Sequence, residues 1–392
     1  MNQKIRVAIT IVPSQIWQGG FNYQFNLCKA IATYFNDKVI MVACFEKDGN
    51  EQDKQSFREM SAVEVIESSA FSRKINVLTF LSIYFLGIDR KASHVFKENK
   101  IDIVFESAKY FGRSLPFPTI AWIPDLQHKY LPGNFSFFSR VKREIGFLSQ
   151  MKNKRILLVS SKTVRNDITK FYPKFRGKVV INRFPSIIST DNLSTDPEEI
   201  LKYYCLPQCF IYLPNQFWKH KNHMTVIEAT RILKSRGESV CVVATGSPWN
   251  PHFPNFYNEL KNLIKRYDLQ ESFRMLGLVP REHVYAFFRS CAFYLNPSQH
   301  EGWSTGVEEA KVFQAPMILS DIPIHREQAN GNASFFPTED FEYLADLISN
   351  KLRAHSGRQQ LRNLAVSFEA EIKDYANRLL NLFEDVQETR QK

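Results

Sequence analysis

The stretch AFYLNPSQHEGWSTGVEEAKVF, residues 292–313, passes from an apolar run through a polar, glycine-containing loop into a helical pattern. The run at 292–295 predicts a buried strand. Residues 306–313 predict a helix with Ser304 or Thr305 as its N-cap, because a hydroxyl side chain there can accept a hydrogen bond from the first amides of the helix. Strand, loop and helix in this order form the repeating unit of a parallel sheet covered by helices on both faces.

The same unit recurs along the whole chain. Apolar runs in the first half predict strands at 5–11, 39–44, 63–66, 101–105, 119–123, 156–160 and 178–182. Longer amphipathic patterns there predict helices at 21–34, 75–96, 137–151 and 162–171. Strands in the second half are expected at 210–213, 239–245, 273–276, 292–295, 317–319 and 333–336. Its helices are expected at 225–234, 257–267, 281–290, 306–313 and 340–353.

A segment rich in Ser, Thr, Asn, Asp and Pro at 185–196 has the composition of a linker. We therefore expect an α/β chain with two Rossmann-like, doubly wound domains, at 1–188 and 197–358, that face a central cleft. The remaining segment, 359–392, predicts a helix that packs across the domains. Ligands of parallel sheets bind at the carboxyl ends of the strands, so the loops that follow strands are the candidate sites.

The composition narrows the class of partner. The chain has 392 residues, with 51 Lys and Arg against 40 Asp and Glu, a net charge of +11. This charge favours an anionic partner such as a nucleotide or a phospholipid surface. Nucleic acid is disfavoured as a partner, because no known nucleic-acid-recognition motif accompanies the positive charge. Six cysteines in mostly apolar stretches and the lack of a secretory segment predict a cytoplasmic protein.

Two features of the 296–313 segment suit a nucleotide. The first amides of the predicted helix, from about Gly306, form an anion site for a diphosphate together with the positive end of the helix dipole. Glu309 can accept hydrogen bonds from two ribose hydroxyls. Alternatively, Glu308 and Glu309 only stabilise a helix N-terminus. A glycosidase pair at Glu301 and Glu309 is disfavoured, since eight helical residues span about 12 Å and a retaining hydrolase needs ~5 Å.

Glu301, seven intervening residues and Glu309 resemble the EX7E motif of the retaining glycosyltransferases of family 4, which have the GT-B fold. The resemblance implies that Glu301 lies by the transferred sugar and that Glu309 binds the donor ribose. It also implies that the amides near Thr305 and Gly306 bind the donor diphosphate. Members of this family generally work without a metal, so no cofactor is expected.

The loop after the first strand of the second domain, residues 213–223, carries further candidates. In family 4 an arginine here is followed five residues later by a lysine, and both bind the diphosphate. Lys221 matches the lysine, whereas Gln216 occupies the position of the arginine, so Lys219 or His220 would have to replace its charge. The loop that starts at Gly277 resembles the one that carries the nucleotide base in the family.

Two first-domain loops complete the resemblance. Gly19 and Gly20 precede a predicted helix and would let the backbone approach a bound sugar, and they do not form the GxGxxG pattern of a dinucleotide site. Asp125 and His128 follow the strand at 119–123, where related enzymes often place a catalytic-site histidine, so the resemblance makes both of them candidate catalytic residues. Either residue can hydrogen-bond an acceptor or a sugar hydroxyl, with loop capping as the alternative.

Metal ligation is not expected. His220 and His223 lack a third ligand at metal spacing, and the pair Cys205 and Cys209 lacks a second pair.

Basic and apolar residues alternate in two first-domain segments. Arg140, Lys142, Arg143, Lys152, Lys154 and Arg155 flank apolar residues between 137 and 148. Arg73, Lys74, Arg90 and Lys91 bracket the apolar run 75–88, which is shorter than the ~18 residues of a membrane span. Such segments can lie on an anionic membrane, here its inner face, or form core helices with one solvated face.

The resemblance to family 4 implies a retaining hexosyltransferase that uses a nucleotide diphosphate sugar and a saccharide or lipid-linked acceptor. The resemblance points to the synthesis of a surface polysaccharide such as O-antigen or capsule. A non-catalytic nucleotide-sugar-binding module and a GT-B epimerase or phosphorylase remain as alternatives.

Overall fold

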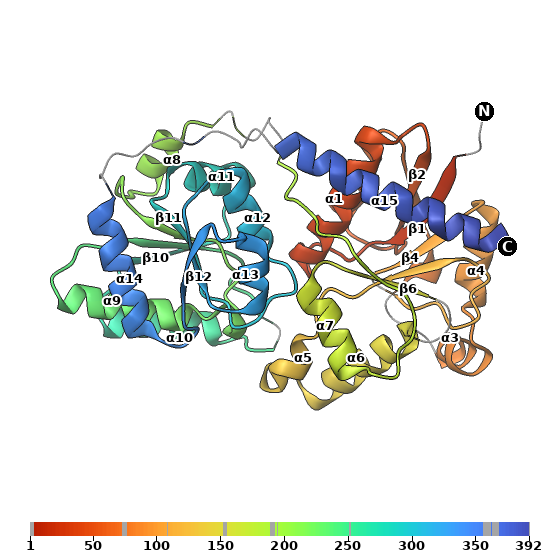
Figure 1. Cartoon of the computed structure of the whole chain (residues 1–392), viewed down its shortest axis with the longest axis horizontal. Coiled ribbons are helices and arrows are strands. Elements are labelled where there is room, and N and C mark those ends of the chain that lie inside the picture. The colour runs from red at the N-terminus through yellow and green to blue at the C-terminus, as the bar shows by residue number, and fades with distance from the viewer. Residues whose placement is uncertain are drawn as a thin grey trace. The chain divides into compact units, whose positions relative to one another are not determined.

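The structure, a computed structural model, describes residues 4–72, 77–107, 109–151, 155–188, 193, 195–250, 252–355, 362 and 368–391. The chain forms two compact units, each built on its own parallel sheet (Figure 1). The first unit contains residues 1–126, 137–185 and 369–392, and the second contains residues 127–136 and 186–368.

The first unit has a seven-stranded parallel sheet in the order β3-β2-β1-β4-β5-β6-β7. Its strands are β1 (Ile5–Thr10), β2 (Val39–Phe45), β3 (Val63–Glu67), β4 (Ile103–Glu106), β5 (Thr119–Trp122), β6 (Ile156–Val159) and β7 (Val179–Ile181). The reversal of order beside β1 is the switch point of a doubly wound fold. All seven predicted strands are confirmed.

The helices of this unit connect successive strands or cover the sheet. They are α1 (Gln18–Tyr34), α2 (Glu51–Arg58), α3 (Val77–Leu81), the π-helix η2 (Ser82–Leu86), α4 (Arg90–Glu98), α6 (Phe137–Gln150), α7 (Lys162–Phe171) and α15 (Phe368–Gln391). The helix expected at 75–96 is divided, and residues 75 and 76 lie outside the described part. Gly87 adopts a left-handed conformation (φ 77°), and Asp89 accepts from the Ala92 amide to begin α4.

The second unit has a six-stranded sheet, in the order β10-β9-β8-β11-β12-β13, whose paired strands are all parallel. Its strands are β8 (Ile211–Leu213), β9 (Val242–Thr245), β10 (Phe273–Gly277), β11 (Phe293–Asn296), β12 (Met317–Ser320) and β13 (Ala333–Phe336). Its helices are α5 (Gln127–Tyr130), α8 (Pro197–Tyr203), α9 (His223–Ser235), α10 (Phe256–Arg266), α11 (Arg281–Ser290), α12 (Thr305–Val312), α13 (Pro323–Ala329) and α14 (Phe341–Ala354).

The division into units differs from the sequence prediction in two places. Residues 127–136, with α5, belong to the second unit rather than the first. Residues 369–391 of α15 belong to the first unit, where α15 runs past α1 and β1 (Figure 1). Arg378 of α15 donates to the Asn182 side chain and to the Arg183 carbonyl, both at 2.9 Å, which fastens the helix beyond the end of β7.

Candidate functional site

Two polar loops of the second unit meet because they follow neighbouring strands. β8 pairs with β11, so the loops after Leu213 and Asn296 leave the sheet at the same edge. The Asn215 side chain donates to Asn296 at 3.1 Å, and the Gln299 amide donates to the His220 carbonyl at 2.8 Å. These bonds fix one loop against the other.

The two loops bring Lys221 and Glu301 together. Lys221 Nζ lies 2.5 Å from Glu301 Oε1, and the two side chains are only 16% and 9% exposed. Burial alone would raise the pKa of Glu301, but the charge of Lys221, with a smaller contribution from His220, lowers this pKa to about 2. The pair is therefore ionised at neutral pH.

A buried histidine, His325 of α13, lies near this pair. Its Nδ1 is 3.0 Å from the Ser320 carbonyl oxygen, which can only accept, so Nδ1 carries the proton and Nε2 is an acceptor. Among the described residues Nε2 has no hydrogen-bond partner. Burial lowers the pKa of His325 to about 4 against the opposing charge of Glu301, so the ring is neutral at pH 7. The sequence prediction did not include this residue.

Buried polar side chains hold the loop between β11 and α12 in place. Asn296 donates to Ser304 Oγ at 3.0 Å and accepts from Ser298 Oγ at 2.7 Å. Gln328 of α13 accepts from the Ser304 amide and donates to Glu308 Oε1, both at 2.9 Å. A fully hydrogen-bonded buried network of this kind fixes the conformation of the loop.

Helix α12 begins at Thr305, and its N-cap is Ser304, one of the two residues predicted for that position. Ser304 makes no capping hydrogen bond, and its hydroxyl accepts from Asn296. Its first amides are thus left without a side-chain cap. A residue without a side chain is needed at position 306, because a Cβ there would lie 2.5 Å from the hydroxyl of the fully buried Tyr294. The helix N-terminus and the Lys221–Glu301 pair belong to the same loop system.

Glu309, one turn into α12, pairs with a residue that the sequence prediction missed. Arg281, the first residue of α11, donates from Nη2 to Glu309 Oε1. The Arg281 guanidinium lies over the Tyr285 ring and donates from Nε to the Tyr285 hydroxyl at 2.9 Å. The Glu309 side chain is 7% exposed, whereas that of Arg281 is 42% exposed. Burial raises the pKa of Glu309, and Arg281 opposes this rise.

The structure also describes the remaining predicted residues of the second domain. Gln216 follows β8 and accepts from the Trp218 amide through its carbonyl. Lys219 is exposed and its ammonium lies 3.9 Å from the centre of the Phe253 ring, whereas His220 is buried. Gly277 ends β10, with a left-handed φ of 71°, and its carbonyl accepts from the Gly246 amide at 2.8 Å.

The glycine pair of the first domain makes room for a tryptophan. Gly19 and Gly20 lie in the first turn of α1, and a Cβ on Gly20 would be 2.3 Å from the Trp17 ring. The Trp17 indole stacks on Trp122 at the end of β5, and Trp122 stacks on Tyr23 of α1. The structure thus gives the pair a packing function; the predicted contact with a sugar is untested.

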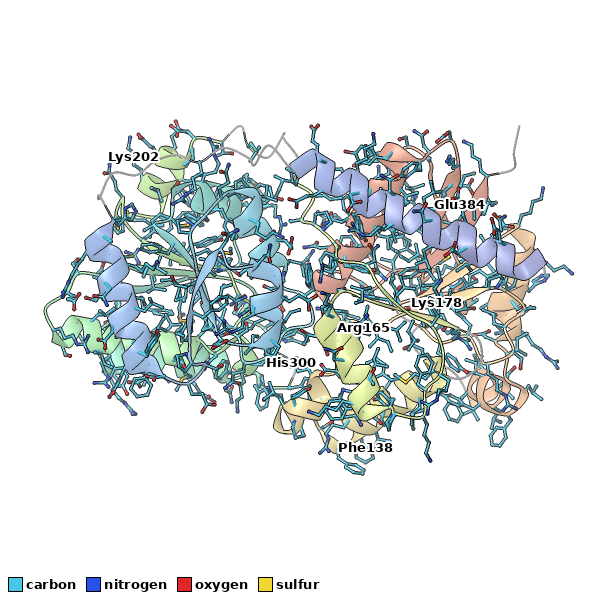
Figure 2. All side chains as sticks on the ribbon, in the orientation of Figure 1. Phe138, Arg165, Lys178, Lys202, His300 and Glu384 are labelled. Carbon is cyan, nitrogen blue, oxygen red and sulfur yellow. The ribbon has the colours of Figure 1, made fainter. Side chains whose placement is uncertain are left out.

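Asp125 and His128 fall in different units. Asp125 lies 4.0 Å from Arg143 of α6, in the first unit. His128 is buried in α5 of the second unit, edge-on to the Phe135 ring. Two residues further on, the Tyr130 ring lies 5.3 Å from that of His300, which is labelled in Figure 2 and directly precedes Glu301. The segment of His128 therefore contacts the loop that carries Glu301.

No group of three or more His, Cys, Asp or Glu side chains that could hold a metal occurs among the described residues. Cys205 and Cys209 are exposed free thiols, and the other four cysteines are buried free thiols. His223 is buried, and burial lowers its pKa to about 3.

A family model and several solved structures are similar to this chain. Residues 207–366 match the family model of Glycosyl transferases group 1, so the second domain carries a domain of that kind. No curated protein sequence matches the chain.

Similar solved structures cover both domains. A glycosyltransferase from Rickettsia africae is 16% identical, with 98% of this chain and 99% of that chain covered and a TM-score of 0.69. A sucrose-phosphate synthase from Thermosynechococcus elongatus is 14% identical, with coverage of 98% and 97% and a TM-score of 0.67. The Anabaena protein HepE in complex with UDP and glucose is 12% identical, with coverage of 98% and 99% and a TM-score of 0.66. The chain has the predicted α/β fold, with two Rossmann-like domains as in GT-B glycosyltransferases.

Proposed function

We propose that this protein is a retaining glycosyltransferase of family 4 that transfers a hexose from a nucleotide diphosphate sugar to a saccharide or lipid-linked acceptor. The main support for this proposal is that Lys221 pairs with Glu301 in the loop before α12, while Glu309 lies one turn into that helix. These residues belong to a domain that matches the group 1 family model. The Anabaena protein of similar fold is solved with UDP-glucose, which makes UDP-sugars the first donors to test.

The electrostatics of the site suit the departure of a diphosphate. Negative charge grows on the leaving phosphate during transfer, and fixed cations and helix-terminal amides stabilise it where it develops. Lys221 provides the cation and the uncapped amides at Thr305 and Gly306 provide the dipoles. In the free protein Lys221 is paired with Glu301, so a bound diphosphate competes with this carboxylate for the ammonium.

The two glutamates have separate tasks in this proposal. Glu301, ionised and shielded from solvent, accepts hydrogen bonds from hydroxyls of the donor sugar. Glu309 binds the ribose through the carboxylate oxygen that does not hold Arg281. Because Arg281 adds a cation beside Glu309, it offsets the arginine that is missing at Gln216. The loop segment with Asp125 and His128 is proposed to bind the acceptor. The product of the transfer is proposed to enter the synthesis of a surface polysaccharide.

Transfer is proposed to need no metal, since Lys221 and the helix amides carry the charge of the diphosphate. Activity should then be unchanged after treatment with EDTA, and a loss that Mg²⁺ or Mn²⁺ restores would contradict this part.

A donor screen tests the function. The full chain is mixed with UDP-, GDP-, dTDP- and ADP-hexoses, and binding is detected as a rise in melting temperature. The stabilising donor is then incubated with candidate acceptors, and NMR of the product shows the anomeric configuration. Transfer with retention supports the proposal. Binding of a donor without hydrolysis or transfer to any acceptor would instead favour a nucleotide-sugar-binding module, and inversion would exclude family 4 chemistry.

A further inference from the structure

Exposed apolar side chains are concentrated on two segments of the first unit. Of the 19 large hydrophobic residues that are exposed in the described part of the chain, 12 lie on α3, η2 or α6. They are Val77, Leu78, Phe80, Leu81, Tyr84, Phe85, Leu86, Phe137, Phe138, Val141, Ile145 and Leu148. Apolar clusters on this scale mark interaction surfaces, whereas isolated exposed hydrophobic residues are common.

The five apolar residues of α6 form one continuous stripe. At about 100° of rotation per residue, Phe137, Phe138, Val141, Ile145 and Leu148 fall within an arc of about 100°. Phe137 is 70% exposed and Phe138 is 83% exposed. The Phe138 side chain points away from the ribbon in Figure 2. The stripe faces solvent, since the core contact of this helix is made by Phe147 on a different side.

Positive charges flank the stripe on both sides. By the same helical rotation Arg140 lies about 60° beyond one edge and Lys142 about 40° beyond the other. Both residues are exposed. Glu144, the one acidic residue of α6, accepts a hydrogen bond from the Tyr172 hydroxyl at 3.0 Å. An apolar stripe between exposed cations is the arrangement of helices that lie in a membrane interface.

The α3–η2 segment has a similar character. Only Ile83 of its ten residues is buried, and the exposed Arg90 and Lys91 follow the segment. This segment follows β3, as α6 follows β5, and parallel strands direct both connections to the same edge of the sheet. Figure 1 draws α3 and α6 toward the same side of the first unit.

We propose that α6, assisted by α3 and η2, docks the protein on an anionic lipid bilayer. Phe137 and Phe138 enter the apolar layer, while Arg140 and Lys142 bind lipid phosphates. The charge on both flanks favours an anionic surface over a neutral protein partner. Arg155 takes no part, because it is buried against Glu106. Arg73, Lys74, Lys152 and Lys154, which the sequence prediction included, lie outside the described residues. No helix among the described residues is long and apolar enough to span a bilayer, so the contact is peripheral.

Flotation with lipid vesicles tests the inference, and it needs neither donor nor acceptor. The full chain is mixed with vesicles of phosphatidylcholine containing 30% phosphatidylglycerol, or of phosphatidylcholine alone. Binding to the anionic vesicles that weakens at high salt is expected. Phe137→Ser with Phe138→Ser should weaken binding at least about tenfold, because two exposed aromatic rings no longer enter the apolar layer. Arg140→Glu with Lys142→Glu should weaken it on the order of tenfold for anionic vesicles.

A matched control replaces two exposed aromatic residues of the second unit, Tyr203→Ser with Tyr343→Ser, and should bind vesicles like the wild type. Thermal melting of all variants, measured without donor, shows that they remain folded. Equal binding by the phenylalanine variant and the wild type would overturn the inference. Absence of wild-type binding, or self-association that the phenylalanine variant abolishes, would overturn it in favour of a protein-binding surface.

Discussion

Arg281, the first residue of α11, donates a hydrogen bond to Glu309 of α12, and so the glutamate proposed to bind ribose is already paired with a cation in the free protein. The pair joins the loop after β10 to the helix after β11, two strands that are not neighbours in the sheet. We expect Arg281→Ala to weaken donor binding about tenfold, the value of a lost charge-assisted hydrogen bond that orients the carboxylate. Isothermal titration with the donor found by the screen measures this effect.

The Arg281 prediction has two controls. Arg281→Lys keeps the charge but loses the planar fork, and should restore only part of the affinity. Arg266→Ala removes an exposed arginine of α10 and should have no effect. An Arg281→Ala protein that binds donor like the wild type would show that the pair is only structural.

Removal of Lys221 should affect both stability and chemistry. Lys221→Met leaves the Glu301 carboxylate buried without its partner, which costs about 3–5 kcal/mol in free energy of unfolding. The double variant Lys221→Met, Glu301→Gln should recover much of this stability but not the turnover, because the cation for the leaving diphosphate is still absent. Denaturant unfolding and the transfer rate provide the two readouts. Lys219→Ala should change the rate less, since that ammonium lies over Phe253.

Stability in acid should depend on Glu301. Its pKa in the folded protein, about 2, lies below the ordinary value of 4.5, so its stabilising contribution is present above pH 4.5 and is lost as pH falls toward 2. The contribution is about 3 kcal/mol. Unfolding measured from pH 6 to pH 2.5 should show a steeper loss for the wild type than for Glu301→Gln below pH 4.5. Parallel curves would contradict an ionised, buried pair.

Protonation of His325 should lower the stability of the protein at a higher pH than protonation of Glu301 does. Its folded pKa of about 4 is below the ordinary 6.5, so the unfolded chain takes up the proton first and stability falls as pH drops from about 6.5 to about 4. His325→Gln should be less stable at pH 7.5, because it loses the fit of the buried ring, and its stability should change less across this interval. A wild-type stability that is flat between pH 7 and pH 4.5 would disprove the buried, neutral assignment.

The close contact between Gly306 and Tyr294 predicts that a second substitution restores stability lost by a first. Gly306→Ala should destabilise the protein by about 1–3 kcal/mol, because the new Cβ meets the buried Tyr294 hydroxyl. Tyr294→Phe in the same chain removes that oxygen and should recover part of the loss. Gly133→Ala, where a Cβ meets nothing within 4 Å, is the control for thermal melting. A Gly306→Ala variant as stable as Gly133→Ala would contradict the described packing.

The two parallel sheets follow from local sequence patterns, since apolar runs and amphipathic periodicity depend on neighbours in the chain. All thirteen strands were predictable for this reason, as was an N-cap of α12 at Ser304 or Thr305. The short helices α2, α8 and α13 were missed, because seven or eight residues give little periodicity.

Which side chains contact one another depends on how distant segments pack together. The sequence around Arg281 and around His325 shows no local pattern that distinguishes them from other surface or core residues. Their interactions are with residues distant in the chain: Arg281 donates a hydrogen bond to Glu309, and the charge of Glu301 acts on His325. The same holds for α15, whose amphipathic pattern predicted a helix but not the unit on which it packs. Periodicity shows that a face is apolar, whereas its partner depends on how the whole chain folds.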